Sequence, residues 1–128
     1  MRSVSKNKAS KKTLDDLIFG FKVCKHVKSN AIVIAKNKKT VGIGAGQMSR
    51  IDATRLALIK VSKKIKLKGF VAASDAFFPF IDGIKLLSKN NCKAIIQPKG
   101  SINDSKIIDF ANKNKLSLYF SNYRLFKH

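Results

Sequence analysis

The 128-residue sequence has few cysteines, no long apolar run and no sign of a secretory signal. Its two cysteines, Cys24 and Cys92, form no CxxC motif and are too few for a disulfide framework. Both lie in apolar surroundings, so we interpret them as buried thiols in a reducing compartment and expect a cytoplasmic protein. The longest apolar runs are far shorter than a membrane span, and residues 1–12 lack the apolar core of a signal peptide.

Acidic residues are scarce as well. All seven acids are aspartate, against 27 lysines and arginines, and the net charge is +20. Such a charge suggests nucleic-acid binding. However, the lysines are scattered over every predicted helix and turn, and no stretch combines aromatic residues with a basic groove as single-strand binders do. We therefore favour a solvated lysine-rich surface that attracts anionic substrates, and expect no specific nucleic-acid site.

The hydrophobic pattern predicts one domain in which strands and helices alternate. Hydrophobic residues make up 45% of the chain, enough for a core. Thr13 is the predicted N-cap of a first helix that ends near Lys28, so residues 1–12 are predicted to be an exposed basic arm before a domain at 13–128. The remaining elements are predicted as helices at about 49–64, 82–91 and 103–114 and strands at 31–35, 40–43, 70–73, 93–97 and 116–120.

This order of elements predicts an α/β fold with three layers. From the first strand onward the chain reads β-β-α-β-α-β-α-β, with helices of ordinary length between the strands. Strands and helices that alternate in this way favour a mostly parallel sheet with helices on both faces.

Four clusters of unusual residues each follow a predicted strand. They are rich in glycine, aromatic residues and arginine, which ordinary turns do not require. In open α/β sheets, ligands bind beyond the carboxyl ends of the strands. We therefore predict one composite site, built from Gly42–Arg50, Ser74–Phe80, Gln97–Ser101 and Asn122–His128.

The first cluster contains Gly42-x-Gly44-x-Gly46, which is neither GxGxxG nor a P-loop. Its glycines are predicted to give backbone freedom at a strand-to-helix corner. The corner leads to Ser49 and Arg50 at a helix start, where free N–H groups favour an anion. The alternative interpretation is a simple tight turn.

The other clusters offer an aromatic face and two charged groups. In Phe77-Phe78-Pro79-Phe80, two rings are predicted to close the sheet edge, and one to face a flat heterocycle. Asp82 is either a helix N-cap or an acceptor for an aminopyrimidine edge. Arg124 is either a surface cation or a bidentate partner for phosphate or carboxylate.

Two enzyme classes have no support in the sequence. A zinc deaminase would need an HxE and a PCxxC motif, and the histidines His26 and His128 lack partners at ligand spacing. A GxSxG hydrolase motif is absent too. We expect no metal.

Several longer motifs occur together in one order. They are Lys28–Ala31 with Ala35–Asn37, Gly42–Arg50, Ser74–Phe80 with Asp82, Gln97-Pro98 with Gly100-Ser101, and Arg124–Phe126 with His128. In order and spacing they resemble the bifunctional family that combines AICAR formyltransferase with IMP cyclohydrolase. The resemblance covers essentially the whole chain and corresponds to the carboxyl-terminal part of the transformylase region.

This resemblance implies a cytidine-deaminase-like domain, the second subdomain of AICAR transformylase, without the deaminase zinc. It implies transfer of a formyl group from the co-substrate 10-formyltetrahydrofolate to the 5-amino group of AICAR (phosphoribosylaminoimidazolecarboxamide) in purine biosynthesis. It also implies that IMP cyclohydrolase activity belongs to a separate amino-terminal domain, which we expect to be absent here. By position, it implies AICAR contacts at Asn30, Arg50, Phe77 and Arg124, folate contacts at Ile51, Asp82, Ser101 and Ile102, and an auxiliary role for His128.

The resemblance also implies that the chain does not act alone. The family's essential Lys-His pair belongs to the first subdomain, so no catalytic residue is expected here, and Lys25-His26 is not its counterpart. Family sites lie between two subunits, so we expect a homodimer, with the upstream subdomain on a separate chain or lost. Ile81 stands where the family usually has arginine, and Lys99 where it has a small residue. The alternative function is a non-catalytic basic module that binds nucleotides or nucleic acid.

Overall fold

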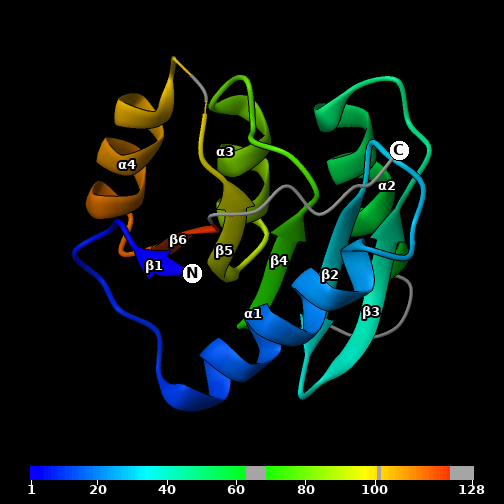
Figure 1. Ribbon diagram of the computed structural model, residues 1–128, viewed down its shortest axis with the longest axis horizontal. Helices are drawn as coiled ribbons and strands as arrows, with labels where there is room; N and C mark the ends of the chain where they lie inside the picture. Colours follow the sequence, from blue (N-terminus) through cyan, green and yellow to red (C-terminus); the bar gives the residue numbers. More distant parts are fainter. Residues whose placement is uncertain (63–68, 101, 122–128) are drawn as a thin grey trace.

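A computed structural model describes residues 1–62, 69–100 and 102–121 (Figure 1). In this part of the chain the elements follow the predicted alternation of strands and helices, with boundaries within a few residues of the predicted ones. They are β1 (Arg2–Ser3), α1 (Lys11–Cys24), β2 (Ile32–Lys36), β3 (Lys39–Gly44), α2 (Arg50–Ser62), β4 (Phe70–Ser74), α3 (Asp82–Lys89), β5 (Cys92–Pro98), α4 (Asp104–Lys113) and β6 (Ser117–Ser121). Only β1 was not predicted.

The strands form one mixed sheet in the order β1-β6-β5-β4-β2-β3. β4, β5 and β6 are parallel neighbours, whereas β2 is antiparallel to both β3 and β4, and β1 is antiparallel to β6. The predicted α/β class is confirmed, but the sheet is mixed rather than mostly parallel. The reason is that α2 connects β3 to β4, two strands of the same direction that are not neighbours because β2 lies between them.

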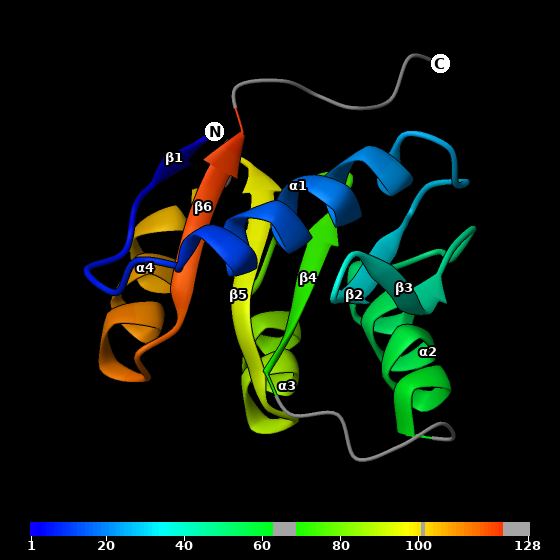
Figure 2. The ribbon, with the colours of Figure 1, turned by 90° about the horizontal axis from the view of Figure 1, so that it is seen from below.

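Helices cover both faces of the sheet, as predicted. Figure 2 shows α1 on one face and α2, α3 and α4 on the other. Side chains alternate along β2, so Ile32 and Ile34 enter the core beneath α2, α3 and α4, while Val33 and Ala35 enter the core beneath α1. A strand buried on both faces needs apolar residues at consecutive positions, which explains the unbroken apolar run of β2.

The basic segment at the N-terminus is part of the domain. Arg2–Ser3 pairs antiparallel with β6 and extends the sheet at its edge. The side chain of Ser5 is buried, and its Oγ accepts a hydrogen bond of 2.8 Å from the backbone N–H of Leu118. The expectation of an exposed arm is therefore wrong here, because main-chain pairing orders the segment although its basic side chains lie in solvent.

The first helix begins earlier than predicted. Ser10 is its N-cap and accepts a hydrogen bond of 3.2 Å from the backbone N–H of Thr13, which lies in the first turn. Asp16 is buried and accepts hydrogen bonds from the backbone N–H groups of Asn37 and Lys38, at 3.1 and 2.8 Å. This carboxylate therefore ties α1 to the turn between β2 and β3.

Both thiols are buried, as predicted. Cys24 is 2% exposed and Cys92 is 6% exposed. Burial raises the pKa of each thiol to about 12, so both remain protonated at neutral pH.

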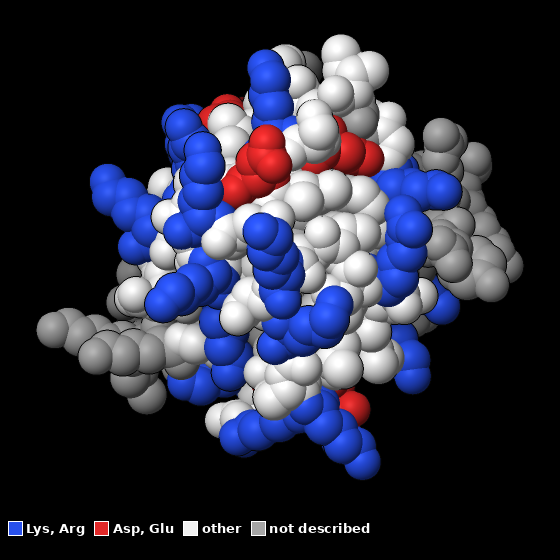
Figure 3. All heavy atoms as spheres, turned by 90° about the vertical axis from the view of Figure 1, so that its left-hand side faces the viewer, with Lys and Arg blue, Asp and Glu red and all other residues white. Residues whose placement is uncertain are grey.

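On the side of the molecule where α4 and β1 lie, lysine and arginine side chains are distributed over much of the surface, and most of the acidic side chains lie near the top of the view (Figure 3). None of the helices within the described ranges combines the length and the apolar character that crossing a bilayer requires.

Candidate functional site

Three of the four predicted clusters lie at one edge of the sheet, at the upper end of the view in Figure 1. β3, β4 and β5 run in the same direction, so the loops that follow them leave from this edge. β2 runs the opposite way, and its first residue, Ile32, lies opposite Gly44 and Ser74. Asn30, just before β2, therefore belongs to the same edge. The fourth cluster, with Arg124 and His128, lies outside the described residues.

A surface pocket of about 350 Å³ opens between these segments. It is formed by the approach to β2, the start of α2 and the loop after β4. Three residues predicted to contact the nucleotide, Asn30, Arg50 and Phe77, meet here. The complete lining among the described residues is Asn30, Met48, Ser49, Arg50, Ala76, Phe77 and Pro79.

Arg50, the first residue of α2, is buried and directed at the sheet edge. Its Nη1 donates to the carboxylate of Asp75 and to the carbonyl oxygen of Ala31, the latter at 3.2 Å. Its Nη2 donates to Oδ1 of Asn30 at 3.0 Å, while Nε has no hydrogen-bond partner among the described residues. The positive charge of Arg50 is thus matched inside the protein, which the prediction of an anion contact did not anticipate.

Asp75 is the residue of this site that sequence reasoning missed. It is 1% exposed and follows β4 directly. Its Oδ1 accepts hydrogen bonds from Arg50 and from the backbone N–H of Ala31, at 3.2 Å for the latter, and its Oδ2 accepts one from Ser29 Oγ at 2.6 Å. The only signal in the sequence was an aspartate at the end of a buried strand, which points to a ligand as readily as to an internal partner.

The three phenylalanines of the β4–α3 loop have three different environments. Phe78 is 1% exposed and packs beneath α3, where an added Cβ at Gly83 would lie 2.7 Å from its ring. Phe77 is half-buried and lines the pocket, while Phe80 is 64% exposed. One ring, rather than the predicted two, fully closes the sheet edge.

The glycines of the first cluster serve two purposes. A Cβ at Gly44 would lie 1.9 Å from the backbone oxygen of Ala53, and one at Gly42 would lie 2.3 Å from that of Ala57. These two glycines therefore let β3 approach α2. Only Gly46 has a left-handed conformation, with φ of +66°, so the predicted backbone freedom is used at one of the three positions.

The end of β5 and the loop after it are hydrogen-bonded to the loop after β4. Gln97 is buried, and its Oε1 accepts a hydrogen bond of 3.0 Å from the backbone N–H of Phe78. Asn103 Nδ2 donates to the carbonyl oxygen of Pro79 at 2.7 Å. These two bonds hold the segment that carries Phe77.

Three of the four residues predicted to contact folate, Ile51, Asp82 and Ile102, lie outside the pocket lining. Ile51 is half-buried on α2, and Ile102 is 97% exposed. Asp82 is exposed at the start of α3, where its Oδ1 accepts a hydrogen bond of 2.8 Å from the backbone N–H of Gly83. Ser101 lies outside the described residues. Their contacts with folate remain predictions.

Two further features lie apart from the pocket. A cavity of about 550 Å³ lies between the start of α1 and the β2–β3 turn, at the other end of β2.

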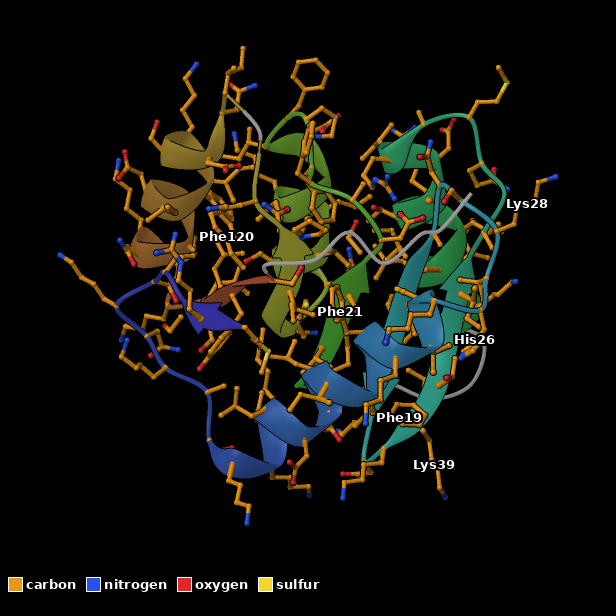
Figure 4. The ribbon with its side chains drawn as sticks, in the orientation of Figure 1. Phe19, Phe21, His26, Lys28, Lys39 and Phe120 are labelled. Atoms are coloured by element: carbon orange, nitrogen blue, oxygen red, sulfur yellow. The ribbon has the colours of Figure 1, made fainter. Side chains whose placement is uncertain are left out.

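Figure 4 shows His26 and Lys28 in the segment after α1. His26 is exposed, while the carbonyl oxygen of Lys28 accepts a hydrogen bond of 2.7 Å from the N–H of Gly46. Within the described residues, no cluster of three or more His, Cys or Asp side chains could hold a metal ion.

Known proteins resemble the chain in sequence along its whole length. The family model of the AICARFT/IMPCHase bienzyme matches residues 1–60. The chain is 46% identical to the bifunctional purine biosynthesis protein PurH of Chlorobium phaeobacteroides (strain BS1) and 50% identical to that of Wigglesworthia glossinidia brevipalpis, with 100% of the chain covered in each case. It spans 25% and 24% of the length of these curated relatives, at their carboxyl-terminal part.

Solved structures resemble the fold at low sequence identity. The dCMP deaminase from the cyanophage S-TIM5 has a TM-score of 0.59 and 11% identity, and covers 88% of this chain and 100% of its own. A diaminohydroxyphosphoribosylaminopyrimidine deaminase/5-amino-6-(5-phosphoribosylamino)uracil reductase from Thermotoga maritima has a TM-score of 0.57 and 15% identity, and covers 86% of this chain and 34% of its own. The deaminase-like architecture is therefore confirmed, as a matter of fold alone.

Proposed function

This chain belongs to the AICARFT/IMPCHase bienzyme family, and we propose that it forms the carboxyl-terminal part of an AICAR formyltransferase site in purine biosynthesis. The chain spans about a quarter of the length of the curated relatives that it matches. The reaction is therefore proposed for an assembly that contains this chain.

The pocket at the sheet edge is the observation that carries the proposal. Asn30, Arg50 and Phe77 come from three separate elements and line one pocket. The same three positions match AICAR contacts by resemblance to the family. That the three residues lie together supports this pocket as the proposed nucleotide site.

Within this pocket, Phe77 would supply an aromatic face for the imidazole ring of AICAR. Its side chain is half-buried, and the residue lines the pocket. The loop after β5 supports it, because Asn103 donates to the carbonyl of neighbouring Pro79. Aromatic stacking of this kind contributes about 0.5–1.5 kcal/mol beyond the area that it buries.

The phosphate of AICAR would need a cation other than Arg50. The charge of Arg50 is matched by Asp75, so its attraction for a further anion is reduced. We therefore assign the phosphate to Arg124, whose guanidinium provides paired donors for an anion. For 10-formyltetrahydrofolate we keep Ile51, Asp82, Ser101 and Ile102, with His128 as an auxiliary residue.

Chemistry at this site requires a base that the described lining of the pocket does not supply. In the proposed reaction the 5-amino nitrogen of AICAR bonds to the formyl carbon and loses a proton, while the bond from that carbon to N10 of the folate breaks and N10 takes up a proton. A positioned general base typically contributes about 10²–10⁴ in rate. Among the described residues that line the pocket, none is histidine, aspartate or glutamate. We propose that the base comes from the family's upstream part and that a second subunit completes the site.

A chimeric enzyme tests this function. These 128 residues would replace the matching carboxyl-terminal part of the Chlorobium phaeobacteroides relative, to which they are 46% identical. We expect the chimera to transfer formyl groups to AICAR, and the isolated chain to show no turnover.

The matched control is the chimera with Phe77→Ala, beside the chimera with Phe80→Ala. Phe77 lines the pocket and Phe80 does not, so only the first change should raise KM for AICAR. An inactive chimera that folds as a stable dimer would contradict the proposed function. Turnover by the isolated chain would contradict the placement of the base.

A further inference from the structure

The buried carboxylate of Asp75 holds the polar groups of the pocket in place. We propose that Asp75 is a positioning residue, which fixes Arg50 and, through Arg50, turns the side chain of Asn30 so that its Nδ2 donor faces the pocket. The identity of the ligand as AICAR rests on the proposed function. The orientation of Asn30 rests only on the contacts described next.

Asp75 is hydrogen-bonded to the residues on both sides of Asn30 in the sequence, Ser29 and Ala31. Its Oδ2 accepts a hydrogen bond from Ser29 Oγ at 2.6 Å, and its Oδ1 accepts one from the backbone N–H of Ala31 at 3.2 Å. The backbone N–H of Asp75 in turn donates to the carbonyl oxygen of Ala31 at 3.3 Å. The residues before and after Asn30 are thus both fixed on one carboxylate that solvent does not reach.

Arg50 links Asp75 to the side chain of Asn30. Its Nη1 is paired with Asp75, which sets the plane of the guanidinium. Its Nη2 then donates to Asn30 at 3.0 Å. A lysine could pair with Asp75 as a point charge, but it lacks a second, rigidly placed nitrogen for Asn30.

The chemistry of the guanidinium decides which way the Asn30 amide points. A guanidinium only donates hydrogen bonds, so the atom that it contacts on Asn30 must be the oxygen. The opposite orientation would set two donors against each other in a partly buried place. Nδ2 is therefore left on the other side of the amide, and it makes no hydrogen bond within the described part of the chain. Asn30 lines the pocket, so this donor is available to a ligand.

It follows that the pocket offers a hydrogen-bond donor at Asn30. A ligand atom bound there must be an acceptor, such as a carbonyl oxygen or an unprotonated ring nitrogen, and not an amino group. For AICAR this favours the carboxamide oxygen or the ring nitrogen as the partner of Asn30.

The side-chain amide of Asn30 can be observed directly by NMR on the ¹⁵N-labelled chain. In the wild-type chain we expect the heteronuclear NOE of Asn30 Nδ2 to approach that of backbone amides in β2. In Asp75→Asn and in Arg50→Lys it should fall to the value of the exposed Asn37. Asp52→Asn is the matched control, because it is the same substitution at an exposed site on α2, where the carboxylate pairs with Arg55 at 3.7 Å. It should leave the Asn30 signal unchanged.

Each variant is first checked for a cooperative thermal transition. Asp75→Asn leaves the buried guanidinium without its counter-charge and risks unfolding. If Asp75→Asn does not fold, Arg50→Lys is the deciding variant, because lysine can keep the charge pair with Asp75 but lacks the second nitrogen that binds Asn30. An Asn30 amide that stays as rigid as in the wild type, in a folded Asp75→Asn or Arg50→Lys chain, would overturn the proposal.

Kinetics of the chimera separate this proposal from the proposed function. In the chimera, Asp75→Asn should raise KM for AICAR about two- to tenfold, the equivalent of one neutral hydrogen bond, and leave KM for the folate within about twofold. Equal increases for both substrates would indicate general loss of structure and contradict a positioning role. An inactive wild-type chimera would contradict the proposed function, while the NMR measurement would still decide the role of Asp75.

Discussion

Alanine substitutions of the three phenylalanines in the β4–α3 loop should have three different effects on stability. Phe78 is 1% exposed and packs against the first turn of α3. Truncating a buried phenylalanine typically costs about 3–5 kcal/mol, because apolar contact is lost and a cavity remains. Phe80 is 64% exposed, so Phe80→Ala should change the free energy of unfolding by less than about 0.5 kcal/mol. Phe77 is half-buried, and its loss should cost on the order of 1 kcal/mol.

Urea denaturation followed by circular dichroism measures these differences. A domain of this size typically has about 5–15 kcal/mol of stability, so Phe78→Ala should remain folded in water but unfold at a much lower urea concentration. The slope of free energy against urea should stay the same in all three variants, since each unfolds from the same fold. Equal losses for Phe78→Ala and Phe80→Ala, or a loss below about 1 kcal/mol for Phe78→Ala, would refute the assignment of Phe78 as the buried ring.

Three further predictions concern packing, the N-terminal segment and the thiols. Gly44→Ala should lower the free energy of unfolding, measured with urea, by about 3 kcal/mol, because its methyl group would lie 1.9 Å from a backbone oxygen of α2. Gly46→Ala should lower it by only about 1 kcal/mol, because only the left-handed φ is unfavourable for alanine. Equal losses would contradict this packing. Ser5→Ala should cost about 1–3 kcal/mol, because the buried N–H of Leu118 loses its acceptor, and Ser3→Ala, which leaves that bond intact, should cost less; no loss at Ser5 would mean that the segment is detached in solution. Burial raises the pKa of both thiols to about 12, so the thiols ionise at lower pH in the unfolded chain than in the folded one. Their contribution to the free energy of unfolding is therefore complete below about pH 8.5. As the pH rises toward 12, the free energy of unfolding should fall by about 1.4 kcal/mol per pH unit for each thiol. Urea titrations between pH 8 and 10 should show this decline in the wild type and a smaller one after both cysteines are replaced by alanine; identical declines would contradict it.

Local sequence patterns were sufficient to predict the helices and the longer strands, but not which strands pair with one another. The apolar runs that became β2 and β4 were visible because each is buried on both faces. Their antiparallel pairing, with Val33 opposite Ala73, joins residues far apart in the chain, and no local pattern encodes it. β1 has only two residues, Arg2 and Ser3, which is too short for any strand periodicity to appear.

The place of the candidate site was predictable for a related reason. Loops that follow strands of one direction leave from one edge, so the strand order along the chain was enough to group Arg50 with Phe77. The internal partner of Arg50 was not predictable, because Asp75 lies 25 residues away and an aspartate in a loop usually faces solvent. Only the fold shows that the two charges are buried together.

The most direct test of the central claim is to map AICAR binding onto the chain. Backbone amide shifts of the ¹⁵N-labelled chain would be followed while AICAR is added to millimolar concentration. We predict saturable shifts confined to the sheet edge, at Asn30, the start of α2 and Ala76–Phe77. The cavity between the start of α1 and the β2–β3 turn serves as the internal control and should not respond. Shifts that gather at that cavity, or that spread over exposed lysines without saturating, would contradict the claim that this edge is the nucleotide site.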